Sequence, residues 1–342
     1  MKLAPITIAL LAASSAYAVS PAKPTAQTIY LGGDIVTVND AAPTAQALAI
    51  KNGRILALGS EADILKLRDE ATRVVDLQGK TLIPGFIDGH GHVFNTGIQA
   101  LSANLLAPPD GAVTRIAELQ QGLRDWAAKP QNKAHGIILG FGYDDSQLKE
   151  KRHPTRQELD AVSEDLPVII IHQSGHLATL NSKALALAGF SPQSKDPEGG
   201  KIRREADGKT PNGVLEETAF FGALLPMFAK LNNQENEAIF KAGMALYASF
   251  GYTTAQEGRA SSSAVKTMYQ LAQKEKLPLD VAAYPDIQIA RDVIAPPYYA
   301  QQYMNGFRVA GAKLNLDGSP QGKTAWLTQP YFVPPAVARR NK

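Results

Sequence analysis

The chain has 342 residues, of which 44% are hydrophobic and 20% are charged, so it is long enough to bury one or two hydrophobic cores. Its formal net charge is only +3 and no basic run occurs, which argues against nucleic acid and against an anionic membrane as partners. Cysteine is absent, so disulfides are excluded and a metal site must use nitrogen and oxygen ligands.

Residues 1–18 have the features of a secretory signal peptide. Lys2 is followed by an apolar stretch from Ile6 to Ala13 and by the A-x-A cleavage pattern Ala16-Tyr17-Ala18. The stretch is too short to span a bilayer as a helix, and a frayed N-terminal helix is the alternative interpretation. We therefore expect a protein that is exported to the periplasm or secreted.

A small β-module is predicted for residues 19–83. Lys51-Asn52-Gly53-Arg54 separates two apolar runs, and Asn-Gly in this position is a strong hairpin signal because both residues tolerate positive φ. The expected elements are strands at 29–31, 35–38, 47–50, 55–58 and 74–77 and a short helix at about 61–68.

The stretch from Leu82 to His92 runs through a Pro-Gly pair and an apolar strand into His-x-His. Side chains alternate faces along a strand, so His90 and His92 point the same way and can hold one metal ion from one side. Gly89 and Gly91 leave room around the two rings. Taken alone, the pattern fits a half-exposed strand end as well as it fits a metal site.

Beyond the histidines, strand and helix patterns alternate. Apolar runs predict strands at 137–139, 168–171, 252–257, 279–284 and 309–317. Helices are expected near 116–126, from 155 to before Pro167, and near 182–188, 216–230, 234–249 and 263–275, whereas residues 191–213 are expected to form a long surface excursion. Repeated strand–helix units favour a parallel α/β sheet or barrel.

Four segments carry a family resemblance: Ile83 to His92, Ser174 to Ala178, Gly213 to Glu217, and Lys313 to Ser319. Together they resemble the amidohydrolase superfamily and, within it, amidohydrolase family 3, the N-substituted formamide deformylase-like proteins. The resemblance implies a metal-dependent-hydrolase (β/α)₈ barrel, or TIM barrel, beside a small β-sandwich. We expect residues 19–83 to supply part of the sandwich and residues 84–342 to supply the first half of the barrel, with an α/β insertion at about 130–215.

By resemblance, His90 and His92 end strand 1 of the barrel and bind a divalent metal, usually zinc, in a site of one or two ions. Lys313 on strand 4 matches the position that is often a carboxylated lysine bridging two metals. A buried lysine near cations has a lowered pKa, so its neutral amine can add carbon dioxide. The alternative for Lys313 is a strand lysine that faces solvent or pairs with Asp317.

His176 and Glu257 are further candidates for catalysis. His176 follows a buried strand and either contacts substrate or satisfies backbone groups of its own loop. Glu257 ends its strand on the active face if the barrel is right. Of the remaining residues, His172 is expected to be structural, His135 and His153 to lie at the surface, and Glu216 and Glu217 to begin a helix, where carboxylates favour the helix dipole.

By resemblance, the family's later ligands are two histidines and an aspartate on strands 5, 6 and 8. They have no counterpart here, because all six histidines lie at or before position 176 and the sequence stops shortly after the expected strand 4. We interpret the chain as truncated after barrel strand 4. The expected function is a metal-dependent amidohydrolase in which a metal-activated water hydrolyses a non-peptide C–N bond of a small amide-type substrate. The alternatives are a catalytically inactive truncated fragment and an exported small-molecule-binding protein. The sequence leaves homo-oligomerisation open.

Overall fold

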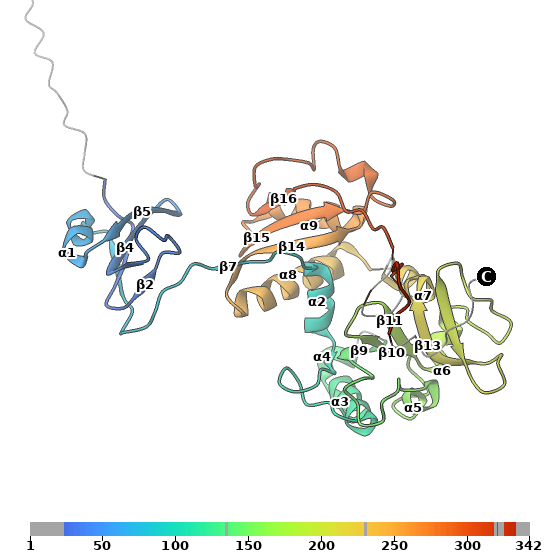
Figure 1. Ribbon diagram of the computed structural model, residues 1–342. Helices are drawn as coiled ribbons and strands as arrows, with labels where there is room; N and C mark the ends of the chain where they lie inside the picture. The colour runs from blue at the N-terminus through green and yellow to red at the C-terminus, as the bar shows by residue number, and fades with distance from the viewer. Residues whose placement is uncertain (1–23, 134–135, 229–230, 318–319, 321–324, 333–342) are drawn as a thin grey trace, which may run out of the picture. The chain divides into compact units, whose positions relative to one another are not determined.

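The computed structural model describes residues 24–133, 136–228, 231–317, 320 and 325–332 (Figure 1). The predicted signal peptide and His135 lie outside the described residues. The chain divides into two compact units, residues 1–84 and 85–342. The division falls immediately before the strand that leads to His90 and His92.

The first unit is a small β-module. Strands β1 (Thr28–Leu31), β4 (Ala47–Lys51), β5 (Arg54–Gly59) and β6 (Arg73–Asp76) form one sheet in the order β5-β4-β1-β6. Asn52 and Gly53 have φ angles of 51° and 71°, which confirms the predicted β4–β5 hairpin. The remaining elements are β2 (Ile35–Val36), which pairs with β3 (Thr44–Ala45), α1 (Glu61–Ile64) and the 3₁₀ helix η1 (Leu65–Leu67).

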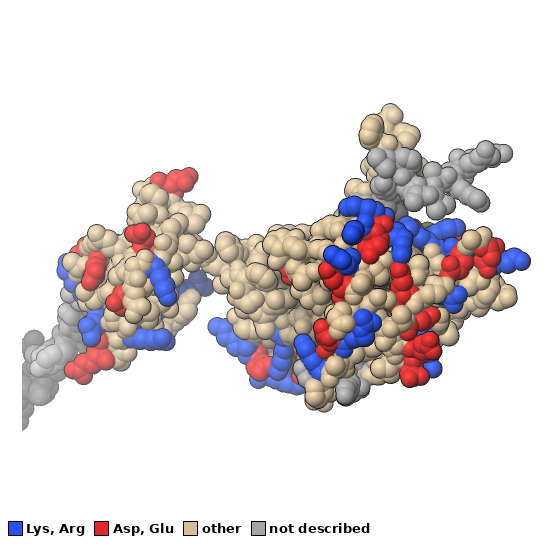
Figure 2. All heavy atoms as spheres, turned by 90° about the horizontal axis from the view of Figure 1, so that it is seen from below, with Lys and Arg blue, Asp and Glu red and all other residues tan. Residues whose placement is uncertain are grey.

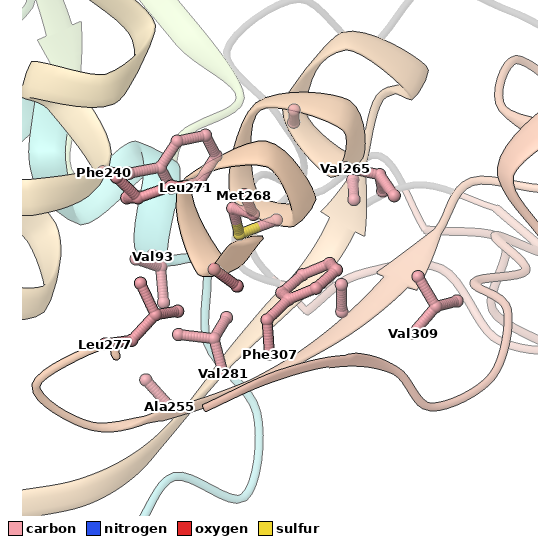
Figure 3. Packing of buried hydrophobic residues seen from close by; sticks show 14 of the residues in the cluster. Val93, Phe240, Ala255, Val265, Met268, Leu271, Leu277, Val281, Phe307 and Val309 are labelled. Atoms are coloured by element: carbon pink, nitrogen blue, oxygen red, sulfur yellow. The ribbon is translucent and has the colours of Figure 1, made fainter. Parts of the chain in front are cut away.

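The second unit contains a parallel sheet with the order β16-β15-β14-β7, in which all neighbours are parallel. Its strands are β7 (Phe86–Ile87), β14 (Tyr252–Ala260), β15 (Asp280–Pro285) and β16 (Phe307–Val309), and helices α2 (Val93–Leu101), α8 (Asn233–Ser249) and α9 (Ser262–Lys274) lie against it. Figure 3 shows the core between these layers, where Phe240 and Met268 meet Val281 and Phe307. Chain order and sheet order agree for these four strands, so their carboxyl ends form one row.

The last strand is shorter than predicted. The expected strand at 309–317 is replaced by β16 and a single bridge between Lys313 and Asp286, and the 3₁₀ helix η2 (Arg291–Val293) lies between β15 and β16. The backbone of Lys313 is still held at the sheet, because its N–H donates to Pro285 O at 2.8 Å and its carbonyl accepts from Ile287 N at 3.1 Å.

A second sheet of the same unit, in the order β12-β13-β11-β10-β9-β8, spans residues 103–217 and defines the insertion. Its strands are β8 (Ala103–Asn104), β9 (Ile138–Tyr143), β10 (Val168–His172), β11 (Leu177–Leu180), β12 (Gly200–Arg204) and β13 (Pro211–Glu217). Its helices are α3 (Ile116–Ala128), α4 (Pro130–Lys133), α5 (Arg156–Asp160), α6 (Ser182–Leu187) and α7 (Thr218–Phe228). β8, β9 and β10 are parallel, whereas β11, β12 and β13 extend the sheet antiparallel.

Two predictions for the insertion are wrong. Residues 191–213 contain β12 and the start of β13, because Ile202 and Leu215 pair in register and are both fully buried. Glu216 and Glu217 therefore end a strand, and the helix begins at Thr218. The charged and glycine-rich residues of the segment indicate turns. Because the β12–β13 hairpin buries only a few apolar side chains, the composition does not reveal its strands.

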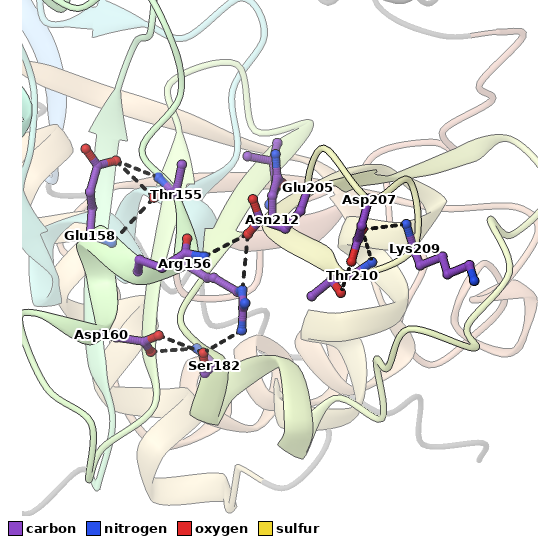
Figure 4. A network of polar contacts seen from close by, with 12 residues as sticks. Thr155, Arg156, Glu158, Asp160, Ser182, Glu205, Asp207, Lys209, Thr210 and Asn212 are labelled. Atoms are coloured by element: carbon purple, nitrogen blue, oxygen red, sulfur yellow. Dashed lines mark hydrogen bonds and ion pairs between the residues drawn. The ribbon is translucent and has the colours of Figure 1, made fainter.

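A polar network ties α5 to the neighbouring elements of the insertion (Figure 4). Thr155 and Glu158 form the predicted capping box. Arg156 contacts Glu205 at 3.3 Å and Ser182 at 3.2 Å, and Ser182 donates to Asp160 at 2.7 Å. These contacts fix α5 against α6 and the β12–β13 hairpin.

On the face shown in Figure 2, basic and acidic side chains are interspersed. Across the described residues, the helices all fall short of the length and apolar character needed to cross a membrane.

Candidate functional site

The His-x-His segment leaves β7 at the carboxyl end of the parallel sheet, and Asp88 anchors it there. The Asp88 carboxylate accepts from His90 N at 3.0 Å, from Tyr247 Oη at 3.0 Å and from Gln256 N at 3.1 Å. Burial and the charge of Asp88 raise the pKa of Tyr247 to about 12, so the phenol remains a donor. The turn that carries the histidines is thus tied to both α8 and β14.

The two imidazoles lie beside each other at the surface of this edge. Their ring centroids are 5.5 Å apart; His90 is exposed and His92 is partly buried. A Cβ at Gly258 would lie 2.8 Å from Gly91 O and 3.3 Å from Cε1 of each ring. Glycine at 258 therefore makes room for both rings, and the backbone uses the approach, since Gly258 N donates to Gly91 O at 2.8 Å.

Glu257 is placed directly behind His92. Its side chain is buried, Oε2 accepts from Phe94 N at the start of α2 at 2.7 Å, and Oε1 lies 3.8 Å from His92 Nδ1. The structure thus brings together His92 and Glu257, which lie far apart in the sequence. The separation from His92 Nδ1 is too long for a hydrogen bond, so the carboxylate borders the imidazole without bonding to it directly.

Lys313 lies further along the same row of strand ends, beside Asp286. Asp286 is buried and pairs with Arg259 through Nε and Oδ2 at 2.8 Å. Burial by itself would raise the pKa of Asp286, but the hydrogen bond from Arg259, with the charge of Lys313 adding to it, holds that pKa below its ordinary value. His92, Glu257, Asp286 and Lys313 follow the order of the strands β7, β14, β15 and β16.

His176 comes from the insertion and is held by Glu217, with Nδ1 2.9 Å from Oε2. A carboxylate only accepts, so Nδ1 donates and Nε2 of the neutral ring keeps its lone pair. The His176 ring lies 6.3 Å from the ring of Phe221, and the guanidinium of Arg259 lies 5.5 Å from the same Phe221 ring. Phe221 therefore links the predicted catalytic histidine to Arg259 near the end of β14.

A cavity of about 720 Å³ adjoins His92. It lies among α2, α8 and the loop of residues 173–175, and its volume is in the range of small-molecule sites. Carboxamide side chains are prominent in its lining: Asn95, Gln99, Asn104 and Gln173. Such a surface offers both donors and acceptors to an uncharged polar ligand.

Sequence reasoning missed a second group of ligating side chains, in the insertion. Ligand atoms of Asp144, Asp145 and His172 all lie within 4.8 Å of one another. His153 joins them, with Nε2 3.7 Å from Asp145 Oδ2. We call these four residues the insertion cluster. His153 was expected at the surface, but only 9% of its side chain is exposed, because Tyr143 and His172 pack against the ring.

Charge is concentrated in this cluster. Contact with His172 is the main cause that lowers the pKa of Asp145 to about 2. Burial is the main cause that lowers the pKa of His153 to about 4, so its ring is neutral at neutral pH. The signal that would have found the cluster is topological: Asp144 and Asp145 follow one predicted buried strand, His172 follows the next, and parallel neighbours end at the same edge.

Comparisons with known proteins place the chain in a family. A family model described as "Amidohydrolase family" matches residues 73–341. The chain is 30% identical over 257 residues to the exoenzymes regulatory protein AepA of Pectobacterium carotovorum subsp. carotovorum, covering 74% of this chain and 54% of that protein. It is 32% identical over 189 residues to the N-substituted formamide deformylase of Arthrobacter pascens, covering 55% of this chain and 34% of that enzyme.

A solved structure shows the same α/β arrangement. An uncharacterized metal-dependent hydrolase from Pyrococcus horikoshii OT3 superposes with a TM-score of 0.66 at 26% identity, covering 91% of this chain and 59% of that one. The chain therefore spans between about a third and three fifths of the length of these three proteins.

Proposed function

Because the chain belongs to the amidohydrolase family, we propose that it carries part of the metal site of a hydrolase that cleaves a non-peptide carbon–nitrogen bond. One observation carries the proposal: His90 and His92 stand side by side at the carboxyl end of a parallel sheet, with buried Glu257 behind His92. We further propose that β7, β14, β15 and β16 are the first four strands of a (β/α)₈ barrel, whose catalytic groups lie at this end of the strands.

The side chains present fit a divalent metal such as zinc. Two imidazoles share one face, and glycine at 258 keeps the space beside both Cε1 atoms open. Nitrogen and oxygen donors suit zinc, and a catalytic zinc site uses three protein ligands. We propose His90, His92 and Lys313 as ligands, Lys313 in a carboxylated form that offers oxygen. When bound, such an ion supplies Lewis acidity and lowers the pKa of water to near neutrality.

The remaining residues have positioning and proton-transfer roles in this proposal. Glu257 fixes the start of α2, whose N-cap is His92, by accepting from Phe94 N, and its other carboxylate oxygen lies 3.8 Å from His92 Nδ1. His176, with Nδ1 committed to Glu217, presents Nε2 as a proton acceptor or, once protonated, as a donor to a carbonyl oxygen or a leaving nitrogen. The reaction class is therefore hydrolysis of a small amide-type molecule.

Support for an uncharged amide-type substrate comes from the cavity beside His92. Its carboxamide lining matches the donors and acceptors of an amide, and Asp110 is the carboxylate among the lining residues. The relative from Arthrobacter pascens is named for deformylation of N-substituted formamides, a reaction of the same class. We also propose export of the protein, on the leader pattern of residues 1–18, which N-terminal sequencing of the mature protein would check.

The experiment is a zinc titration of the metal-free full chain, followed by elemental analysis and by turnover on a panel of N-substituted formamides and cyclic amides. We expect the double variant His90→Asn/His92→Asn to lose one equivalent of zinc, while Lys209→Gln, an exposed loop substitution, loses none. Equal zinc content and affinity in the double variant and the parent would overturn the metal assignment. Zinc binding without turnover would support the alternative of a metal-binding but inactive chain.

A further inference from the structure

We propose that the insertion cluster, Asp144, Asp145, His172 and His153, is a second divalent-metal site of the zinc type, built from different residues than the His90–His92 site. It lies where β9 and β10 end side by side. In this parallel pair His172 is opposite Tyr143, so the two aspartates that follow Tyr143 reach the His172 ring. The backbone alone thus gathers three of the four side chains.

Ligand atoms of Asp144, Asp145 and His172 are close enough to share an ion, and His153 approaches them through the second oxygen of Asp145. His172 Nε2 lies 3.3 Å from Asp145 Oδ1 and 3.7 Å from Asp144 Oδ1, and His153 Nε2 lies 3.7 Å from Asp145 Oδ2. Four ligands held about 2.0–2.2 Å from a tetrahedral ion stand roughly 3.3–3.6 Å from one another. The two separations of 3.7 Å are long for hydrogen bonds and close to those of ligands around one ion.

His172 supplies the independent sign that something is bound here. Only 7% of its side chain is exposed, and its buried Nε2 atom has no hydrogen-bond partner, although it is directed at the two carboxylates. Buried polar atoms in native proteins almost always have a partner. An ion among Asp144, Asp145 and His172 would provide one.

The charge of the cluster is also unbalanced. Two carboxylates face two imidazoles, and the nearby cation Arg203 is engaged by Glu216. Asp144 accepts from Ser146 N at 2.9 Å and from Gln147 Nε2 at 3.1 Å, which fixes its carboxylate without adding positive charge. Partly buried carboxylates are stable when they are paired or coordinate a metal, so a divalent cation would balance this site.

Neighbouring groups can hold the imidazoles in the orientation that metal binding requires. Tyr143 Oη lies 3.1 Å from His153 Nδ1, and Ser174 Oγ lies 2.8 Å from His172 Nδ1. In the metal-free ring Ser174 N donates to the same Nδ1 at 3.0 Å, which places the ring proton on Nε2. Metal binding at Nε2 would leave the ring proton on Nδ1. Nδ1 would then donate a hydrogen bond to Ser174 Oγ, and the bond from Ser174 N to Nδ1 would be lost.

The occupant we infer is a zinc-type ion held by four protein side chains, which is the closed coordination of a structural site. Such an ion would cross-link the carboxyl ends of β9 and β10. The loop that starts at His172 carries Ser174 and His176, so the ion would also fix the position of the predicted catalytic histidine.

The test uses the full chain in the His90→Asn/His92→Asn background, so that the two sites are counted separately. Zinc alone, and Co²⁺ as a coloured substitute, are titrated into metal-free protein. We expect one equivalent to remain bound, with the intense visible absorption of tetrahedral Co²⁺. Adding Asp145→Asn to this background should weaken the zinc affinity at least about 100-fold. Loss of a residue that only hydrogen-bonds to a ligand costs about 10- to 100-fold, so a larger loss indicates direct coordination. Asp165→Asn, an exposed carboxylate of the same insertion, is the matched control and should bind unchanged.

A second measurement covers the case in which Asp145→Asn fails to fold. Nitrogen-detected NMR of the parent histidines should show the His172 proton moving from Nε2 to Nδ1 when zinc is added. If no zinc remains in the double-variant background, or if His172 merely takes up a proton and pairs with Asp145, the proposal is wrong. Either result leaves the His90–His92 assignment standing, because that site is measured in the parent.

Discussion

The His90–His92 site and the insertion cluster hold their imidazoles in opposite ways. His90 is exposed, and its partner His92 is supported by a single buried carboxylate at 3.8 Å. In the insertion cluster, His172 and His153 are more than nine-tenths buried and face two aspartates. The first site is exposed at the ends of its strands, whereas the imidazoles of the second are buried beside carboxylates that stay partly exposed.

The difference teaches how each kind of site is encoded. His90 and His92 are two residues apart in the turn that follows β7, which ends at Ile87 before the predicted strand reaches them, so one short segment brings the two rings together. The insertion cluster is assembled by the parallel pairing of β9 and β10 and by a loop that folds His153 back onto Tyr143. The zinc affinity of the His90–His92 site should therefore be sensitive to the packing of the turn that carries it. The zinc affinity of the insertion cluster should depend on the stability of the insertion sheet.

The largest expected effect comes from a substitution in α2, which should weaken the His90–His92 site and leave the insertion cluster unchanged. A Cβ at Gly97 would overlap the carbonyl of Ile239 where α2 crosses α8. Because backbone cannot move aside as a side chain does, Gly97→Ala should lower the free energy of unfolding by about 3 kcal/mol. His92 is the N-cap of α2, so zinc affinity at His90–His92 should fall, while zinc at the insertion cluster stays.

The control for this prediction is Gly222→Ala on the exposed side of α7, where a Cβ meets no atom within 4 Å. It should stabilise the chain by about 0.5–1 kcal/mol, since alanine is the better helix former. Urea unfolding and zinc titration of both variants make the comparison. If Gly97→Ala disturbs both sites equally, the second unit transmits strain as one body and the two sites are not independent.

The sequence predicted those features that are determined by residues close together in the chain. The Asn52-Gly53 hairpin and the Thr155–Glu158 capping box depend on short-range patterns. The contact between His92 and Glu257 could be proposed only with the barrel in mind, because it joins β7 to β14. His153 was misplaced because nothing in its polar neighbourhood shows that the loop turns inward against Tyr143.

A substitution at Glu158 should have the opposite selectivity: it should destabilise the insertion and leave the His90–His92 site unchanged. Glu158 caps α5 by accepting from Thr155 N at 2.8 Å and pairs with Arg152 at 2.7 Å. Glu158→Ala removes both contacts and should cost about 1 kcal/mol, whereas Glu158→Gln keeps the cap and loses only the charge. Hydrogen exchange should show faster opening of α5 and of the ends of β9 and β10, with β7 and α2 unchanged.

The same residue gives a pH dependence whose sign is fixed. The hydrogen bond from Arg152 holds the folded-state pKa of Glu158 below its ordinary value of 4.5. The unfolded chain therefore binds more protons in that range, so this part of the stability is present above pH 4.5 and is lost as the pH falls below it. Glu158→Gln should flatten that slope, and an unchanged slope would show that the Arg152 pair adds nothing.

The smallest expected effect lies at the contact that joins the two regions, where the Arg259 guanidinium stands 5.5 Å from the centre of the Phe221 ring. Arg259→Lys keeps a cation beside buried Asp286 but loses the planar face, and Phe221→Leu removes the ring. A double-mutant cycle of the two changes should give a coupling of about 0.5 kcal/mol, because the guanidinium is partly exposed. Turnover should respond more strongly than stability, since Phe221 also borders His176. A coupling of zero would mean that the contact between Arg259 and Phe221 does not connect β14 energetically to the insertion, and the position of His176 would then depend on contacts within the insertion, such as that with Glu217.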